Sequence, residues 1–126
     1  MRDRRADRAG AERRGHRGEA LAIWALRLKG YRLLERRLKT PAGEIDLVML
    51  SPKGPVCFVE VKARADAFAA ALSVTMPQRA RIVRAAFLYL GSRPALATRG
   101  ARFDIVAVAP GRWPRHHPDA WRPDDR

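Results

Sequence analysis

The sequence predicts a single α/β domain in which helices flank a mixed β-sheet. Three observations lead to this prediction. The chain has 126 residues, the size of one ordinary domain, and 47% of them are hydrophobic, enough to build one core. Its apolar residues recur with a helical period in some segments and alternate in others. Turn-forming residues separate these segments, and the expected order is helix, three strands, helix, strand.

The first helix is expected to start near Arg17 and to end at Gly30. Apolar residues recur in it at positions i, i+3, i+4 and i+7, which predicts the buried face. These residues are Leu21, Trp24, Ala25 and Leu28. The preceding segment, residues 1–14, is rich in Arg, Asp and Ala without a periodic apolar face, and this composition predicts a disordered basic segment.

Three strands are expected next, over residues 31–39, 44–50 and 56–63. The turn at residues 51–55 contains two prolines and a glycine, so the second and third strands should form a hairpin. Alternation assigns side chains to the two faces of each strand. In the second strand Ile45, Leu47 and Met49 share one face and Glu44 and Asp46 the other. In the third strand Cys57, Val59 and Val61 oppose Phe58, Glu60 and Lys62.

The second half of the chain should contain one helix and one strand. Residues 65–76 are rich in alanine and fit no single pattern. Pro77 suits the first turn of a helix that ends at Gly91, and Phe103 to Ala109 reads as the last strand. Residues 111–126 are expected to be a tail rich in Pro, Trp and His, which leaves residues 15–110 as the folded domain.

The chain carries a formal net charge of +13. Residues 15–110 hold sixteen basic and seven acidic side chains, so most of the excess lies in the expected domain. A nucleic acid is the natural partner of such a surface, through phosphate contacts and counterion release. The alternative is a genome rich in GC that replaces Lys by Arg. This bias would explain the choice of Arg but not the surplus of charge.

Composition also argues against several protein classes. No apolar run approaches the roughly 18 residues that a membrane span requires, and the N-terminus lacks the apolar stretch of a secretory signal. We therefore expect no membrane association and a cytoplasmic location. Cys57 is the single cysteine, so an internal disulfide is impossible and a cysteine-based zinc site is not expected.

The candidate chemistry lies in the predicted hairpin. Glu60 and Lys62 share a face of the third strand, and pairing of the strands would bring Asp46 beside them. Three charged groups between apolar positions are costly to bury unless they are paired or bind a metal. Two carboxylates can hold Mg²⁺, and a lysine can position the attacking water and offset charge on a phosphate. The alternative is a structural ion pair between Lys62 and one of the carboxylates.

Several short motifs occur in a characteristic order. They are Gly18-Glu19-Ala20, Gly30-Tyr31, the block from Gly43 to Val48, the block from Phe58 to Arg64, and the block from Arg102 to Val106. Together they resemble the YraN family, also called UPF0102, over about residues 15–121. That family is similar to archaeal Holliday junction resolvases and to the PD-(D/E)xK nucleases. The resemblance implies a restriction-endonuclease-like fold.

The resemblance also implies roles for individual residues. Asp46 and Glu60 would be metal ligands, with the backbone carbonyl of Val61 and the side chain of Glu19 as further ligands, and Lys62 would be the catalytic lysine. Glu19 can equally be an exposed acid in the first turn of the helix. The residues expected to contact nucleic acid are Arg64, Gln78, Arg79, Arg81 and Arg84.

Other positions are read as structural. Where the family usually has Lys-Gln-Arg, this chain has Pro77-Gln78-Arg79, so Gln78 can also be ordinary polar helix surface. His116 and His117 match a C-terminal family motif but are expected to be exposed. Asp104 is expected to pair with an arginine.

Three functions remain open at this point. The first is an endonuclease that uses Mg²⁺ or Mn²⁺ to cut DNA, on branched or otherwise structured substrates. A junction has two strands to cut, so this function would call for a homodimer. The second is a non-catalytic nucleic-acid-binding protein on a nuclease fold. The third is an RNA-associated accessory protein, although the sequence offers no aromatic platform for stacking bases.

Overall fold

A five-stranded mixed sheet forms the centre of the domain. The computed structural model describes the backbone of residues 4–123 and the side chains of residues 16–66 and 68–123. The strands are β1 (Arg32–Thr40), β2 (Gly43–Leu50), β3 (Val56–Lys62), β4 (Ala101–Ala107) and β5 (Arg115–Trp121), and they lie side by side in this order. The β3–β4 pair is parallel and the other pairs are antiparallel. The mixed sheet and the β2–β3 hairpin are therefore as the sequence predicts.

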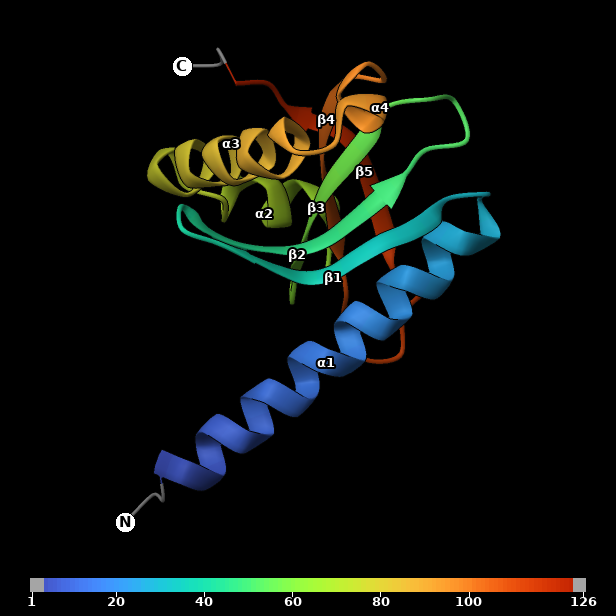
Figure 1. Ribbon diagram of the computed structural model, residues 1–126. Coiled ribbons are helices and arrows are strands. Elements are labelled where there is room, and N and C mark those ends of the chain that lie inside the picture. Colours follow the sequence, from blue (N-terminus) through green and yellow to red (C-terminus); the bar gives the residue numbers. More distant parts are fainter. Residues whose placement is uncertain (1–3, 124–126) are drawn as a thin grey trace.

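Helices cover both faces of this sheet (Figure 1). Helix α1 (Arg4–Leu28) packs on one face, whereas α2 (Ala67–Leu72) and α3 (Met76–Gly91) pack on the other, with the short α4 (Pro94–Ala97) following α3. The larger core lies under α2 and α3 and the smaller one under α1. This architecture agrees with the restriction-endonuclease-like fold that the resemblance implies.

Helix α3 starts at a capping box. The Thr75 hydroxyl accepts a hydrogen bond from the backbone N–H of Gln78, and the Gln78 side chain accepts one from the N–H of Thr75. Pro77 occupies the first turn, where a missing N–H costs nothing. Ile82, Ala86 and Leu90 are among its buried residues. The helix predicted between Pro77 and Gly91 is thus confirmed.

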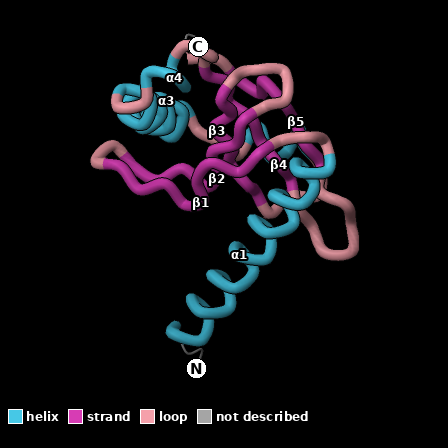
Figure 2. Tube along the Cα trace, turned by 45° about the vertical axis from the view of Figure 1, so that its right-hand side comes forward, coloured by secondary structure: helices cyan, strands magenta, loops and turns pink. Residues whose placement is uncertain are grey.

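Helix α1 departs from the sequence prediction in two ways. It begins at Arg4, well before Arg17, and so runs through most of residues 1–14, while residues 1–3 lie outside the described part. Arg and Ala both favour helix, which is the physical reason for the extension. In both views this first part of α1 projects beyond the sheet (Figures 1 and 2).

The buried face of α1 is also different from the predicted one. Of the predicted stripe only Ala25 is buried, and Leu21, Trp24 and Leu28 are 46–71% exposed. Ala22, Ile23, Ala25 and Leu26 face the sheet instead. Small residues at the contact let the helix approach the sheet closely. Gly18 marks a particularly close approach, because a Cβ atom added there would lie 3.0 Å from the Val108 side chain.

Residues 115–121 form strand β5, whereas the sequence predicted a tail. Trp121 is buried and stacks on Phe103 with 4.4 Å between ring centroids. The segment contains Pro118 and Asp119, residue types that are depleted in strands, and tertiary contacts of this kind hold it in the sheet. Residues 124–126 of the predicted tail lie outside the described part. Within residues 4–123, no helix is long and apolar enough to cross a membrane.

Candidate active site

Asp46 lies where β2 separates from β3. The ladder between these strands ends at the Leu47–Val59 pair, although β3 continues beside β4 as far as Lys62. In place of the next ladder contact, the Oδ2 atom of Asp46 accepts a hydrogen bond of 2.8 Å from the backbone N–H of Val61. The carboxylate is thereby fixed to the strand that carries Glu60. Figure 1 shows the β1–β2 hairpin running on past this point, away from β3.

The strand also exchanges faces at Asp46. Ile45 packs in the core under α3, whereas Leu47 and Met49 pack in the core under α1. The prediction that all three share one face is therefore wrong. Strict alternation fails because β2 is released from β3 at this residue. As a result Asp46 lies between the two layers, within electrostatic reach of groups from both.

The structure brings Glu60 and Lys62 to Asp46. Burial, above all, and the adjacent Asp46 raise the pKa of Glu60 to about 8, against an opposing effect of Lys62. Burial also raises the pKa of Asp46, and so does the charge of Glu19, whereas the Val61 N–H, a side-chain hydrogen bond with Glu60 and the charge of Lys62 lower it. The charge of Asp46 therefore disfavours the ionised form of Glu60 in this partly enclosed place. A bound cation would relieve this repulsion.

The donors present fit a hard divalent ion. The Oε1 atom of Glu60 is buried without a hydrogen-bond partner, so it has a lone pair free for a ligand. Mg²⁺ usually takes one or two protein carboxylates and keeps several waters. Among the side chains of residues 16–66 and 68–123, no group of three or more His, Cys, Asp or Glu is gathered closely enough to hold an ion. Two side-chain carboxylates are thus what this site offers, and backbone oxygens and water would fill the remaining ligand positions.

A small hollow of about 90 Å³ opens beside Glu60. Its walls include Glu44, Gln78 and Arg81, so the start of α3 faces the carboxylates. Gln78 uses its side-chain oxygen for the capping box, which leaves its amide nitrogen without a role in the cap. Arg81 is exposed and brings a positive charge to the hollow.

Glu19 reaches the site from the other layer. Its side chain is only 8% exposed, so the prediction of an exposed acid is wrong. The Nε atom of Arg37 donates to both carboxylate oxygens, at 2.7 and 3.3 Å. Arg37 was not singled out from the sequence, because an arginine in a basic strand carries no visible signal.

The other predicted nucleic-acid contacts are dispersed. Arg64 and Arg84 are exposed, and Arg64 donates to the carbonyl of Ala63. Arg79 turns towards β5, where its guanidinium lies 5.6 Å from the Trp121 ring centroid and its Nε donates to the carbonyl of Val74. Of the three arginines of α3, Arg81 is thus the one that lines the hollow beside Glu60.

A second polar cluster surrounds Asp104 on β4. Arg102 donates to both of its carboxylate oxygens, at 2.8 and 2.7 Å, which confirms the expected arginine partner. His116 contacts the same carboxylate at 2.8 Å. Burial alone would raise the pKa of Asp104, but these contacts and the N–H of Asp119 lower it overall. The His116 side chain is 3% exposed, so its predicted exposure is wrong: it is a structural link between β4 and β5.

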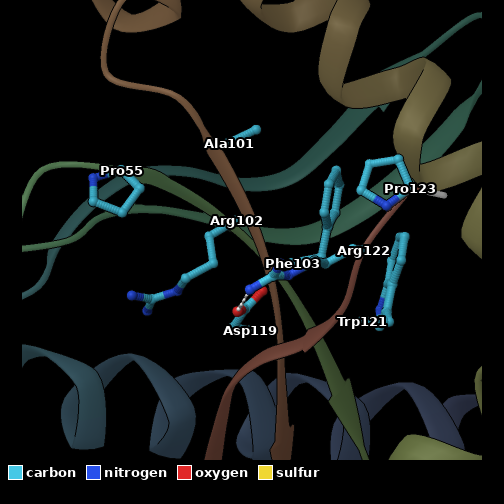
Figure 3. A pocket seen from close by; sticks show the side chains of 8 residues that line it. All are labelled: Pro55, Ala101, Arg102, Phe103, Asp119, Trp121, Arg122 and Pro123. Carbon is cyan, nitrogen blue, oxygen red and sulfur yellow. Dashed lines mark hydrogen bonds and ion pairs between the residues drawn. The ribbon is translucent and has the colours of Figure 1, made fainter. Parts of the chain in front are cut away.

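A larger hollow of about 390 Å³ adjoins this cluster (Figure 3). Arg102, Phe103, Asp119 and Trp121 are among its walls. None of the residues Asp46, Glu60 or Lys62 lines it. This hollow is therefore separate from the charged site.

Comparison with known proteins agrees with the sequence motifs. The model of the family described as "Uncharacterised protein family UPF0102" matches residues 18–108. The chain belongs to the UPF0102 family. A UPF0102 protein of Parvibaculum lavamentivorans is 53% identical over 113 residues, covering 90% of this chain and 84% of the relative. The UPF0102 protein amb4503 of Paramagnetospirillum magneticum is 54% identical over 119 residues, covering 90% and 91%. The matched region includes Glu19, Asp46, Glu60 and Lys62.

Proposed function

We propose that this UPF0102 protein is a metal-dependent endonuclease that hydrolyses DNA phosphodiester bonds in the cytoplasm, with branched or structured DNA as its substrate. The observation that carries the proposal is the pair Asp46 and Glu60. One carboxylate is fixed by the Val61 N–H, and the other has a buried oxygen without a partner. Stability alone gives little reason to gather these groups, because burial raises the pKa of both carboxyl groups and the charge of Asp46 raises that of Glu60 further.

Each residue of the site has a part in this proposal. Asp46 and Glu60 would hold Mg²⁺ or Mn²⁺, with the Val61 carbonyl as a further ligand. The ion, when bound, would polarise the phosphate and acidify a water molecule. Lys62 places a positive charge beside both carboxylates, where it can orient the attacking water and offset charge on the phosphate. Arg81, at the hollow, can hold a phosphate of the DNA backbone.

The net charge of +13 supports a DNA partner. Symmetric cutting of a four-way junction would require two sites, and the proposal therefore includes a homodimer on that substrate. A non-catalytic DNA-binding role is the second candidate, and the charge favours it equally. The two differ in whether Asp46 and Glu60 matter for more than folding.

A cleavage assay on linear, nicked, flapped and four-way DNA tests the proposal. Wild-type protein should cut at least one form with Mg²⁺ or Mn²⁺ and none with EDTA. Asp46→Ala and Glu60→Ala should lose cleavage yet keep DNA binding, because each removes a ligand and a negative charge that faces phosphate. If no form is cut while the DNA is still bound, the non-catalytic role stands instead.

A further inference from the structure

Arg37, which lies opposite Asp46 in the sheet, has an unusual backbone conformation. Its φ is +53°, a left-handed value that is uncommon for residues other than glycine. On β1, Arg36 pairs with Leu47 and Leu38 with Ile45, so Arg37 stands opposite Asp46. The register of β1 against β2 also shifts between Leu33 and Glu35. Conformations of this kind cost energy and persist where the surrounding structure requires them, often at functional sites.

The conformation serves a contact with Glu19. The Arg37 Nε atom lies 2.7 Å from the Oε1 atom of this carboxylate, while the neighbouring Arg36 is 3.7 Å away and also donates to the carbonyl of His16. Gly18 allows α1 to approach the sheet at this level, so that the following residue faces inward. Because Arg37 stands opposite Asp46, this contact brings Glu19 to the level of Asp46, and the charge of Glu19 raises the pKa of Asp46.

We propose that Arg37 is a positioning residue of the metal centre: it holds the buried Glu19 carboxylate in a fixed orientation beside Asp46, so that Glu19 supports the ion bound there. The inference rests on the proposed function and deepens it, because it adds a residue that acts through another. A buried carboxylate without a partner is costly, so Glu19 needs a group to pair with. The arginine side chain supplies a permanent positive charge, and its donor fixes the orientation of both carboxylate oxygens.

The experiment measures the dissociation constant of Mn²⁺ by electron paramagnetic resonance. Removing an outer-shell partner of a metal site typically weakens metal binding about 10–100-fold. Arg37→Gly should show a loss of this size, and Arg37→Lys should recover part of it, because the charge returns without the planar fork. Lys39→Ala is the matched control, since it removes an exposed positive charge from the same strand and should leave Mn²⁺ binding unchanged.

A double variant separates positioning from a general effect. Glu19→Gln should weaken Mn²⁺ binding as much as Arg37→Gly, and the double variant should be no worse than either, because both act through the same carboxylate. Melting curves without metal establish that each protein is folded at the assay temperature. Arg37→Asn, which tolerates a positive φ, replaces Arg37→Gly if the glycine variant does not fold.

The outcomes are distinct. Wild-type affinity in a folded Arg37→Gly protein would overturn the role of Arg37 and leave the proposed function intact. Effects of Arg37→Gly and Glu19→Gln that multiply in the double variant would show that Arg37 does not act through Glu19, which also overturns the inference. A wild-type protein that binds no Mn²⁺ would overturn the proposed function itself, and the inference with it.

Discussion

Replacing Glu60 by glutamine should stabilise the metal-free protein at neutral and mildly alkaline pH. The pKa of Glu60 is raised from its ordinary 4.5 to about 8 in the folded state. Between these two values the unfolded chain loses the proton while the folded protein retains it, so the free energy of unfolding falls as the pH rises. Glutamine has a similar shape and no charge, so Glu60→Gln removes this loss.

The shift sets the size of the effect. One pKa unit corresponds to about 1.4 kcal/mol, so a shift of this size would give roughly 5 kcal/mol as an upper limit. Relaxation of the site and the coupling to Asp46 reduce it, and we expect a gain on the order of 2–4 kcal/mol at pH 8. For a domain of this length the gain corresponds to a rise in Tm of about 8–15 °C.

Thermal melts in EDTA at several pH values between 4.5 and 8.5 test this expectation. The difference in Tm between Glu60→Gln and wild type should be near zero at pH 4.5 and should grow up to pH 8. The pH dependence of groups that do not interact with Glu60 is common to both proteins and cancels in the difference, which leaves the titration of Glu60 and its coupling to Asp46. A variant that is less stable than wild type at every pH, with a gap that does not change, would show that Glu60 is a structural ion-pair residue and that the reasoning is wrong.

Three further predictions follow from the same charges. Binding of Mg²⁺ or Mn²⁺ should release protons, and the affinity of the protein for the ion should rise about tenfold per pH unit between pH 6 and the Glu60 pKa of about 8. Calorimetry in buffers of different ionisation enthalpy can measure both effects. An affinity that does not vary with pH would speak against Glu60 as a ligand. Asp104→Asn should lower the free energy of unfolding at pH 7 by about 3–5 kcal/mol, because the lowered pKa of Asp104 marks a stabilising carboxylate. The same variant should leave Mn²⁺ binding unchanged. An unchanged urea midpoint would contradict the stabilising role of Asp104. Arg81→Ala should weaken DNA binding and reduce the slope of the logarithm of the binding constant against the logarithm of the salt concentration by about 0.9. Arg79→Ala should mainly lower the Tm, because Arg79 contacts Trp121. Equal salt slopes for wild type and Arg81→Ala would exclude a phosphate contact at Arg81.

The hairpin is the part of the site that sequence patterns could predict. Turn residues and alternation paired β2 with β3 and placed Glu60 and Lys62 on one face. This simple geometry brought Asp46 within reach, because strand pairing is a local property of adjacent segments. The exchange of faces at Asp46 could not be predicted from the sequence. It depends on where the hydrogen-bonded pairing of β2 and β3 ends, and no local sequence pattern indicates that point.

Long-range contacts account for the remaining differences. The face of α1 was misassigned because Leu and Trp outrank Ala in hydrophobicity, while the sheet accepts only small side chains at Ala22 and Ala25. Strand β5 forms because Trp121 stacks on Phe103 and His116 contacts Asp104. Both contacts join β5 to the neighbouring strand β4. Arg37 reaches Glu19 through a left-handed backbone that the sequence does not signal.

The central claim is that Asp46 and Glu60 together hold one divalent ion. Anomalous diffraction from crystals soaked in Mn²⁺ at pH 8 tests it most directly, since this pH is close to the Glu60 pKa of about 8 and a bound ion then easily displaces the remaining proton. One strong anomalous peak is expected within ligand distance of both carboxylates, and it should be lost in Glu60→Gln. A peak elsewhere, such as at the Asp104–His116 pair, or no peak at saturating Mn²⁺, would contradict it.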